Sequence, residues 1–484
     1  MNNKSAPHDG RRNWAPLEEL RALHEQKIRA EKLPDYVAAG FAGFFEKLCA
    51  DETGILREHD IRPVEPSALR SFDDLAEYVE AGTAALGRCS IAKLNGGLGT
   101  SMGLEKAKSL LPVTDGLSFL DIIVRQVEHF RQHSGVALPL LFMNSFNTEN
   151  DTRAALSGFA GNAGGIPLTF LQNRFPKVLA ATGEPAAWPA NPQLEWNPPG
   201  HGEFYSALTH SGTLRALLDA GIEYLFVSNA DNLGATLSLE ILGLMAAHDV
   251  PFIMEVADRT PNDRKGGHLA VAADGRLTLR ESAQCHAADV DSFQDIARHR
   301  YFNTNNLWVN VRALEAAQKT SADGILDLPM IRNEKRLDPQ DEQSPAVYQI
   351  ESAMGAAISL FDNAQAVVVP RSRFLPVKKT NDLVLLRSDC YTLNDDFTIS
   401  ENRPDGLGPC VVDLDPRYYG TIAGFDARFA AGAPSLLGCT SLTIKGDVAF
   451  GGGVRCAGDV AIQNSSGEQA RVADGAHLDG SVHF

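Results

Sequence analysis

The residues best suited to chemistry lie in a glycine-rich loop that is followed by two lysines. Residues 93–103 read Lys-Leu-Asn-Gly-Gly-Leu-Gly-Thr-Ser-Met-Gly, and Lys106 and Lys108 come shortly after them. The apolar segment 89–92 before the loop predicts a strand that ends where the loop begins. Glycine has no Cβ, so successive backbone N–H groups can approach an anion, and the lysines add the charge that a phosphate group needs. The pattern indicates a site for nucleotide phosphates.

Two well-known phosphate-binding loops do not match this sequence. A Walker A loop reads Gly, four residues, then Gly-Lys-Ser/Thr, and no glycine of this loop starts such a pattern. The dinucleotide-binding pattern G-x-G-x-x-G begins correctly at Gly97 and Gly99 but has Met102 in place of its third glycine. A kinase or a dehydrogenase is therefore disfavoured. A glycine-rich stretch taken alone is more often a plain turn, so the rest of the chain must decide.

Composition excludes several classes of protein. The chain has 484 residues, enough for two or three domains, and a formal net charge of −17, which argues against non-specific binding to nucleic acid or to an anionic membrane. No apolar run approaches the roughly 18 residues of a membrane span. The seven cysteines are scattered without a C-x-x-C pair. This usage is typical of a reducing cytoplasm, where we expect the protein, and of neither a disulfide scaffold nor a zinc site.

The pattern along the chain predicts an α/β protein. Residues 1–87 read as a helical region. From 88 to 390, short apolar runs such as 138–143, 224–227 and 252–256 alternate with amphipathic helices, which is typical of a largely parallel sheet covered on both faces. Ligands of such sheets bind beyond the carboxyl ends of the strands, where the glycine-rich loop and residues 229–231 both lie.

The tail, residues 391–484, has a different rhythm. Between 442 and 462, small and apolar residues alternate, and the triplet Gly-Asp-Val recurs at Gly446 and Gly458. Short apolar pairs separated by Gly-Asp favour the stacked coils of a β-helix over hairpins of regular length. The flat side of such a stack could form a homo-oligomer contact, unless its open end is capped within the chain.

The glycine-rich loop and the two lysines resemble those of the eukaryotic-type UTP–glucose-1-phosphate uridylyltransferases, also called UDP-glucose pyrophosphorylases. Five further blocks, in the same order, are similar to other blocks of that family. They are 198–203 (Pro-Pro-Gly-His-Gly-Glu), 227–235 (Val-Ser-Asn-Ala-Asp-Asn-Leu-Gly-Ala), 265–267 (Lys-Gly-Gly), 302–308 (Phe-Asn-Thr-Asn-Asn-Leu-Trp) and 374–378 (Phe-Leu-Pro-Val-Lys). The resemblance runs from about residue 90 to the C-terminus. It implies a Rossmann-like (GT-A-like) nucleotidyltransferase domain at 88–390, a helical N-terminal region at 1–87 and a left-handed β-helix at 391–484.

The resemblance also implies a reaction: a phosphate oxygen of glucose 1-phosphate attacks the α-phosphorus of UTP and expels pyrophosphate. The nucleophile is already ionised, so the enzyme mainly has to bring two anions together and neutralise developing charge. Lys108 and Lys378 match the family's catalytic phosphate lysines, although Lys379 beside Lys378 leaves open which of the two points inward. Asp231 matches the aspartate assigned to Mg²⁺, an ion that needs only one or two carboxylates.

The family's binding residues map onto this sequence block by block. The residues expected to bind UTP are Leu94, Asn95, Gly96, Gly97, Lys108, Gln172, Gly200, Asp231 and Lys378. Those expected to bind the sugar phosphate are Gly96, Gly97, His201, Asn229, Ala230, Asp231, Gly267, Glu281, Asn305 and Asn306. We expect Gln172 to read the base and His201 to donate a hydrogen bond to phosphate. Glu203 stands where the family usually has an aspartate.

Two other functions remain open at this point. The chain could be a UDP-sugar pyrophosphorylase for another hexose 1-phosphate, or a catalytically silent nucleotide-sugar sensor. The blocks at 265–267 and 302–308 favour glucose over N-acetylated sugars, and the presence of both lysines and Asp231 argues against a silent protein.

Overall fold

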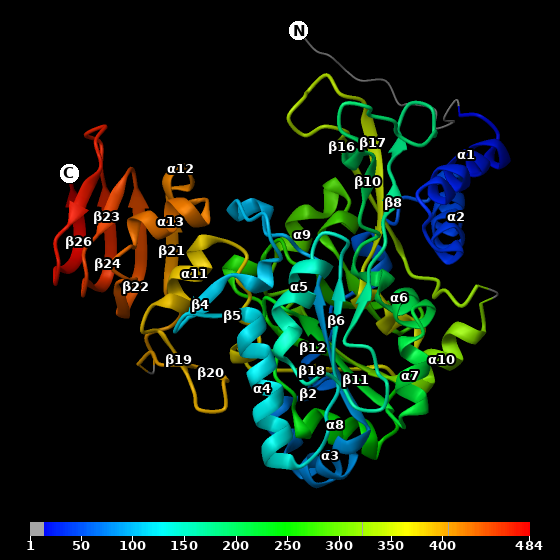
Figure 1. The fold of residues 1–484 in the computed structure, drawn as a ribbon, viewed down its shortest axis with the longest axis horizontal. Helices are drawn as coiled ribbons and strands as arrows, with labels where there is room; N and C mark the ends of the chain where they lie inside the picture. The colour runs from blue at the N-terminus through cyan, green and yellow to red at the C-terminus, as the bar shows by residue number, and fades with distance from the viewer. Residues whose placement is uncertain (1–13, 322, 405) are drawn as a thin grey trace.

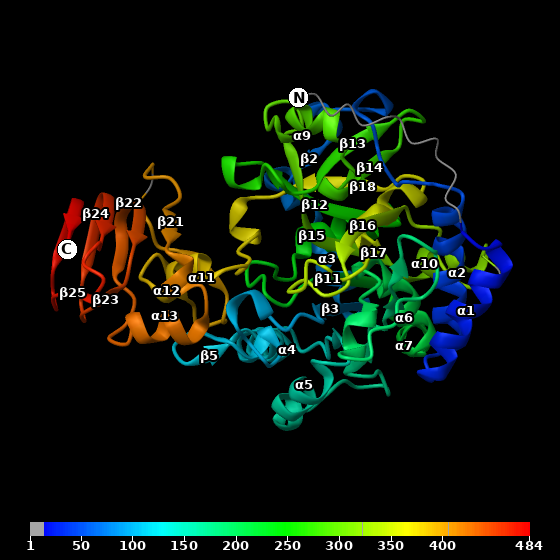
Figure 2. The ribbon, with the colours of Figure 1, turned by 90° about the horizontal axis from the view of Figure 1, so that it is seen from above.

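A computed structural model describes residues 14–321, 323–404 and 406–484, except for the side chain of Asn262. The fold is mixed α/β, built on a large and mostly parallel central sheet, as the sequence predicts (Figure 1). Two smaller parts lie at opposite ends of the long axis: helices near the N-terminus, and a stack of strands at the C-terminus (Figures 1 and 2). The first 13 residues of the expected helical region lie outside the described residues.

The central sheet has the strand order β2-β18-β12-β15-β11-β3-β6-β7. Neighbouring strands along this path are parallel, except that β15 runs antiparallel to both β11 and β12. Strands β1, β13 and β14 extend the sheet beside β15. The strands are β1 (Ile61–Arg62), β2 (Arg70–Ser71), β3 (Cys89–Asn95), β6 (Leu140–Asn144), β7 (Thr169–Leu171), β11 (Tyr224–Asn229), β12 (Phe252–Asp258), β13 (His268–Ala272), β14 (Leu277–Arg280), β15 (Tyr301–Asn310) and β18 (Gln365–Val368).

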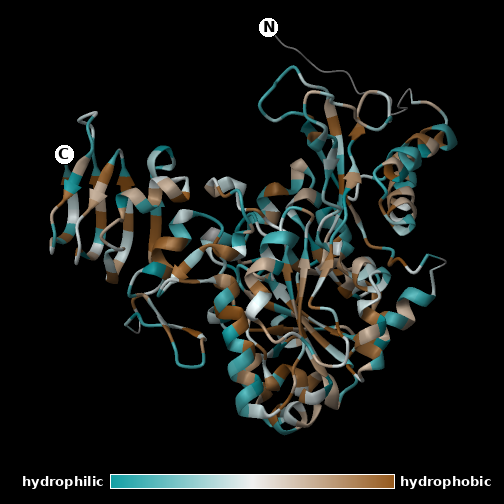
Figure 3. Cartoon of the chain, viewed as in Figure 1, coloured by the Kyte–Doolittle hydropathy of each residue, from teal (hydrophilic) through white to brown (hydrophobic). Residues whose placement is uncertain are grey.

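Helices cover both faces of this sheet, because its central strands are apolar on both sides. On β15, Leu307 and Val309 belong to the core on one face, and Trp308 belongs to the core on the other. Figure 3 shows the corresponding apolar colouring at the centre of the sheet. One face carries α3 (Val79–Ala85), α4 (Phe119–Ser134) and α8 (Leu239–Ala247), and the other carries α6 (Phe204–His210), α7 (Thr213–Asp219) and α10 (Val311–Lys319).

Helix α4 begins with a side-chain cap at Ser118. The Ser118 hydroxyl accepts a hydrogen bond from the Asp121 backbone N–H at 3.1 Å, and the Asp121 carboxylate accepts one from the Ser118 N–H at 2.9 Å. This reciprocal capping box satisfies two backbone donors that the first turn leaves unpaired. The other helices in and around the central domain are α5 (Glu149–Ala155), α9 (Val290–Gln294) and α11 (Thr380–Arg387).

The N-terminal part is helical only in places. Helices α1 (Leu17–Ala30) and α2 (Asp35–Cys49) share an apolar core with short strands of the central domain. Between α2 and α3, the two-residue strands β1 and β2 pair with β13 and β18 of the central sheet. A strand of two residues is too short to show hydrophobic alternation, so the sequence pattern does not reveal it. The strands next to α1 and α2 are β8 (Phe175–Pro176), β9 (Val178–Leu179), β10 (Trp196–Asn197), β16 (Met330–Arg336) and β17 (Ala346–Ser352).

The C-terminal part is built mainly of parallel strands. One sheet has the order β21-β22-β24-β26 with all neighbours parallel, and β23 pairs with β25, also in parallel. The elements are β21 (Val411–Leu414), α12 (Pro416–Tyr419), α13 (Ile422–Arg428), β22 (Ser435–Lys445), β23 (Val448–Phe450), β24 (Arg455–Gln463), β25 (Ala470–Val472) and β26 (His477–His483). The two-stranded pairs β4 (Pro112–Thr114) with β5 (Leu117–Ser118), and β19 (Tyr391–Leu393) with β20 (Ile399–Glu401), complete the fold.

Candidate active site

A cleft of about 660 Å³ lies at the carboxyl ends of β3, β6 and β11. These strands are parallel neighbours, so the loops that follow them meet at one edge of the sheet. The cleft contains eleven of the residues expected from the sequence: Leu94, Asn95, Gly96, Gly97, Lys108, Gln172, Gly200, His201, Asn229, Ala230 and Asp231.

The glycine-rich loop folds back so that Lys108 enters the cleft. The Lys108 backbone N–H donates to the Gly97 carbonyl at 3.0 Å. Gly99 has a φ of +65°, and a Cβ there would lie 2.8 Å from Leu104 Cδ1, so this turn requires glycine. The Lys108 ammonium donates to Asp231 Oδ2 at 2.5 Å. The cation and the carboxylate expected at the phosphates therefore lie in contact.

The loop after β11 lies beside the glycine-rich loop. The Ala230 N–H donates to the Leu94 carbonyl at 3.0 Å, which joins the ends of β11 and β3. Asn229 Oδ1 accepts a hydrogen bond from Asn305 Nδ2 at 2.9 Å. Asn305 has a φ of +61°, a conformation that asparagine tolerates better than most residues. This contact joins the sugar-side asparagine to the phosphate side of the cleft.

Gln172 lines the cleft and keeps part of its hydrogen-bonding capacity unused. Its backbone N–H donates to Asn144 O at 2.7 Å, and its side-chain Nε2 donates to Gly200 O at 2.9 Å. One hydrogen on Nε2 and part of the accepting capacity of Oε1 remain for a ligand. This donor and this acceptor match the imide edge of a pyrimidine. Gly200 has a φ of +79°, and a Cβ there would lie 2.3 Å from Ser352 O. Only glycine allows this approach, which holds the Gly200 carbonyl in place for Gln172.

His201 is a neutral hydrogen-bond donor. Burial lowers the pKa of its imidazole to about 4, so the ring is uncharged near neutral pH. Its Nδ1 accepts a hydrogen bond from the Met354 backbone N–H at 2.8 Å. A neutral imidazole carries one N–H, which must then be on Nε2. The ring lines the cleft, as expected for a donor to phosphate.

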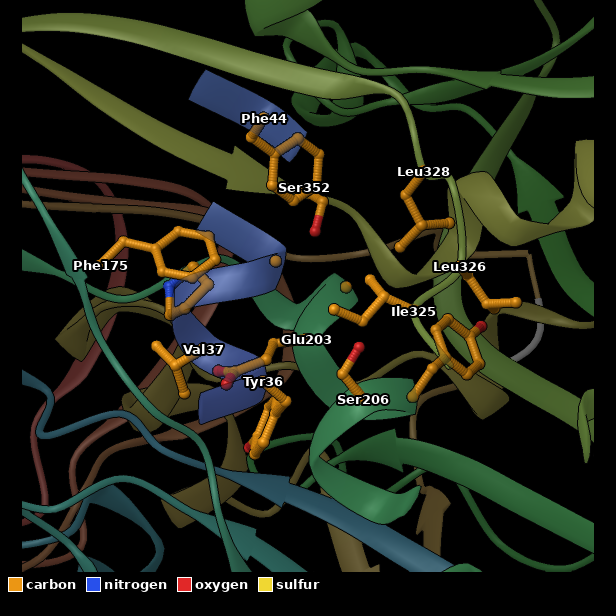
Figure 4. A pocket seen from close by; sticks show the side chains of 14 residues that line it. Tyr36, Val37, Phe44, Phe175, Glu203, Ser206, Ile325, Leu326, Leu328 and Ser352 are labelled. Carbon is orange, nitrogen blue, oxygen red and sulfur yellow. The ribbon is translucent and has the colours of Figure 1, made fainter. Parts of the chain in front are cut away.

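Glu203 lies behind this loop rather than in the cleft. Figure 4 shows it next to Tyr36 and Val37 of α2, at a small cavity of about 20 Å³, which is room for about one water molecule. Its Oε2 accepts from the Asn173 N–H at 2.9 Å, and its Oε1 is buried without a partner in the described structure. Burial raises the pKa of this carboxyl to about 7, against the opposing effect of the Asn173 hydrogen bonds.

Lys378 comes from a distant part of the sequence and is not among the residues that line the cleft. The Val377 N–H donates to the Asp231 carbonyl at 3.2 Å, so the next residue, Lys378, follows immediately beside the Asp231 loop. Burial raises the pKa of the Glu281 carboxyl, and the nearby Lys378 charge opposes that effect. Lys378, and not Lys379, is thus the cation close to Glu281.

None of the other residues expected on the sugar side, Gly267, Glu281, Asn305 and Asn306, is among those that line the cleft. A Cβ on Gly267 would lie 2.5 Å from Glu281 Oε2, so the glycine lets this carboxylate pack against the backbone. Asn306 does not line the cleft. Its side chain is 0% exposed, and its Nδ2 donates to Glu255 Oε2 at 3.0 Å and to Arg373 O at 3.1 Å. Both amide hydrogens are used, which corrects the expectation that Asn306 contacts the sugar directly.

Comparisons with known proteins are consistent with this geometry. The family model described as UTP–glucose-1-phosphate uridylyltransferase matches residues 38–456. The chain belongs to this family. A curated relative of that name from Musa acuminata is 38% identical over 448 residues, with 92% of this chain and 93% of the relative covered. One from Saccharomyces cerevisiae is 38% identical, with 87% and 83% covered.

Solved structures give the same result. A variant of the UDP-glucose pyrophosphorylase from Leishmania major in complex with UDP-glucose is 42% identical and superposes with a TM-score of 0.87, covering 96% of this chain and 99% of the other. The UDP-glucose phosphorylase from Trypanosoma brucei is 41% identical, with a TM-score of 0.86 and coverage of 96% and 100%.

Three buried charged residues near the site of this uridylyltransferase chain were missed by sequence reasoning. Lys93, Glu255 and Arg373 are each less than a tenth exposed and lie beneath the two loops that carry Asp231 and Lys378. Burial and the nearby Arg373 lower the pKa of Lys93 to about 7, against the effect of Glu255. The available signal was a lone charge inside an apolar strand, at position 93 and again at position 255.

Proposed function

We propose that this chain forms UDP-glucose and pyrophosphate from UTP and glucose 1-phosphate. The observation that carries the proposal is that Lys108 and the segment just before Lys378 both bond to Asp231, although these residues are far apart in the sequence. A site that joins two polyanions needs concentrated positive charge, and a protein with a net charge of −17 must supply it locally.

The proposed reaction is in-line attack by a phosphate oxygen of glucose 1-phosphate on the α-phosphorus of UTP. The P–O bond to the β-phosphate breaks, and pyrophosphate leaves with the electron pair. No general base is required, since the attacking oxygen is already ionised. Lys108 and Lys378 neutralise the charge that accumulates on the transferred phosphoryl group and the leaving group, and His201 donates its Nε2–H to phosphate.

The residues present fit a magnesium ion at Asp231. The Asp231 carboxylate faces the cleft, and Lys108 contacts only its Oδ2 among the described residues. No group of three or more His, Cys, Asp or Glu side chains in the described part of the chain is arranged to hold a metal. One carboxylate oxygen, completed by phosphate oxygens and water, matches the preference of Mg²⁺. When bound, the ion would neutralise phosphate charge and align the two substrates.

The remaining residues divide into a nucleotide side and a sugar side. For UTP, we propose backbone contacts from Leu94, Asn95, Gly96 and Gly97, with Gln172 and Gly200 at the base. For the sugar phosphate, we propose His201, Asn229, Ala230, Gly267, Glu281 and Asn305, with Asn306 supporting them from behind. The pairing of Gln172 Nε2 with Gly200 O supports the base assignment, because it fixes the orientation of the amide.

Several finer features of the family are also proposals for this chain. They are a GT-A-like catalytic domain at 88–390, a left-handed β-helix within 391–484 and a homo-oligomer contact through that β-helix. The parallel pairing of β21, β22, β24 and β26 supports the β-helix, and the unpaired edge of β26 would be its contact. The seven cysteines, scattered without a C-x-x-C pair, support a reducing, cytoplasmic location. No helix of the described structure is long and apolar enough to cross a bilayer.

A substrate panel tests the proposed function. The purified protein is mixed with UTP and Mg²⁺, and pyrophosphate release is followed with glucose 1-phosphate, galactose 1-phosphate, N-acetylglucosamine 1-phosphate or no sugar. We expect the fastest release with glucose 1-phosphate and none without a sugar. Dominance of another sugar phosphate would replace glucose as the substrate. Binding of UDP-glucose without any release would identify a nucleotide-sugar sensor instead.

A further inference from the structure

We propose that Glu255, Arg373 and Asn232 form a positioning unit that holds the Lys378 segment against the Asp231 loop, and that turnover depends on this unit although none of the three touches substrate. The inference rests on the proposed function, because the position of Lys378 affects the rate only if substrate phosphates bind beside it. The three residues belong to β12, the segment before Lys378 and the loop after β11.

The unit is centred on the Glu255 carboxylate, which is 0% exposed. Arg373 donates to it twice, from Nε to Oε2 at 2.8 Å and from Nη2 to Oε1 at 2.6 Å. Trp308 Nε1 donates to Oε1 at 2.9 Å, and Asn306 Nδ2 donates to Oε2 at 3.0 Å. Four hydrogen bonds from three side chains leave this carboxylate a single orientation, which in turn fixes the guanidinium of Arg373.

Asn232 connects this buried pair to the catalytic loops. Its Nδ2 donates to the Arg373 carbonyl at 3.1 Å, and its Oδ1 accepts from the Leu375 N–H at 2.8 Å and from the Gly234 N–H at 3.2 Å. It also pairs with Pro376 in an isolated antiparallel bridge. The segment before Lys378 is thus bonded along its length to the loop that carries Asp231.

Further contacts fix the far end of the Asp231 loop. Arg373 Nη2 donates to the Thr236 carbonyl at 2.9 Å. The buried Lys93 ammonium donates to the Ala235 carbonyl at 2.8 Å and to Ser228 Oγ at 2.7 Å. Two buried basic side chains therefore hold carbonyls of one loop, and one of them, Arg373, also belongs to the Lys378 segment.

Lys378 depends on this arrangement because its own side chain has no anchor. It is exposed, and its ammonium makes no ion pair or hydrogen bond with the described part of the chain. Only its backbone N–H is bonded, to Asp382 at 2.7 Å. A buried ion pair often gives little net stability compared with apolar side chains of similar volume, but its geometry is specific. The placement of this pair beneath two catalytic loops assigns it a positioning role.

A double-mutant cycle tests whether the unit acts through Lys378. Arg373→Lys keeps the charge but loses the two-pronged guanidinium. We expect it to lower kcat about 100-fold in the unaltered protein, since small displacements of catalytic groups cost about this much. In the Lys378→Ala background, the same change should cost less than about threefold, because the group that it positions is already gone. Equal losses in both backgrounds would overturn the proposal in favour of a general structural role.

A matched control variant separates an effect on the position of Lys378 from an effect on the stability of the protein. The Arg403 guanidinium is also nearly buried, and it donates to the carbonyls of Gly408, Leu436 and Cys439 at 2.7 to 2.9 Å, remote from the cleft. We expect Arg403→Lys to lower the Tm but to leave kcat within about twofold, because it removes buried guanidinium hydrogen bonds that lie away from the catalytic loops. A comparable loss of kcat in the control would count against the proposal.

Hydrogen exchange tests the positioning independently of the reaction. The Leu375 and Val377 amides are bonded to the Asp231 loop, so peptide 373–378 should exchange slowly in the unaltered protein and faster in Arg373→Lys and Asn232→Ala. A peptide covering 224–227 should not change. Unchanged exchange in 373–378 would refute the positioning role even if the enzyme is active. If the unaltered protein makes no UDP-glucose, the proposed function is wrong. Hydrogen exchange of peptide 373–378 still shows whether Glu255, Arg373 and Asn232 hold the Lys378 segment in place.

Discussion

Replacing Glu203 with glutamine should make the protein more stable at alkaline pH. The Glu203 side chain is 7% exposed and has one carboxylate oxygen without a partner in the described structure. Burial raises its pKa to about 7, compared with an ordinary value of 4.5, whereas the Asn173 hydrogen bonds act in the opposite direction. The folded state therefore holds a proton that the unfolded chain releases. This contribution to stability is complete below pH 4.5 and is lost as the pH rises through 7.

The size of the effect follows from the difference between the two pKa values. A shift of one unit corresponds to about 1.4 kcal/mol, so the wild-type protein should lose about 2 to 3 kcal/mol through this one group between pH 5 and pH 8. Glutamine has the same shape, can still accept from the Asn173 N–H and does not ionise. Glu203→Gln should therefore gain about 2 to 3 kcal/mol relative to wild type on going from pH 5 to pH 8.

The assay is urea unfolding of both proteins at the two pH values, with Glu195→Gln as a control. Burial alone would raise the pKa of Glu195, but hydrogen bonds from Lys27 and the Trp188 N–H outweigh it and lower the pKa. Its stabilising contribution is thus nearly complete by pH 5, and Glu195→Gln should destabilise the protein by similar amounts at both pH values. An equal effect of Glu203→Gln at pH 5 and pH 8 would refute the reasoning about the buried carboxyl.

Three further changes concern the cleft itself. Lys378→Ala should lower kcat about 100- to 1,000-fold, as the loss of one charge-stabilising donor does, whereas Lys379→Ala should have little effect; equal losses in the UDP-glucose assay would reverse the assignment. Gly200→Ala would place a Cβ 2.3 Å from Ser352 O at a φ of +79°, a strain of about 1 to 3 kcal/mol. We expect a lower Tm and weaker UTP binding by calorimetry. Unaltered UTP affinity would argue against a base contact at Gly200. His201→Ala should lower kcat/KM about 10- to 100-fold, and because the pKa of His201 is about 4, the pH–rate profile between pH 5.5 and 8 should show no step that this substitution removes.

The framework of the fold was accessible from sequence because its signals are local. The strands predicted at 138–143, 224–227 and 252–256 are found as β6, β11 and β12. The parallel arrangement then implies that the loops after these strands share one edge, which is why the glycine-rich loop and Asp231 could be placed in one cleft.

The error over Asn306 has a physical reason. The cluster of asparagines in β15 suggested a ligand-facing surface, but side chains alternate along a strand, and Asn306 lies on the same face as Trp308. Both side chains donate to the buried Glu255. The positive φ of Asn305 lies where the pairing of β15 with β12 shifts its register, and no residue pattern shows that in advance.

The buried supports of the site could not be found by local reasoning. Glu255 and Arg373 are separated by 118 residues, and only the neighbouring strands β12 and β18 bring their segments together. Each residue alone is an ordinary charged side chain. Their importance depends on burial and on mutual geometry, which composition and spacing do not record.

A crystal structure of this protein with UDP-glucose bound would decide whether the cleft at the ends of β3, β6 and β11 is the active site. We expect the uracil at Gln172 and the diphosphate between the Lys108 and Lys378 ammonium groups, each about 3 Å from a phosphate oxygen. A diphosphate beyond the reach of both lysines, or UDP-glucose bound in a different cavity, would contradict it.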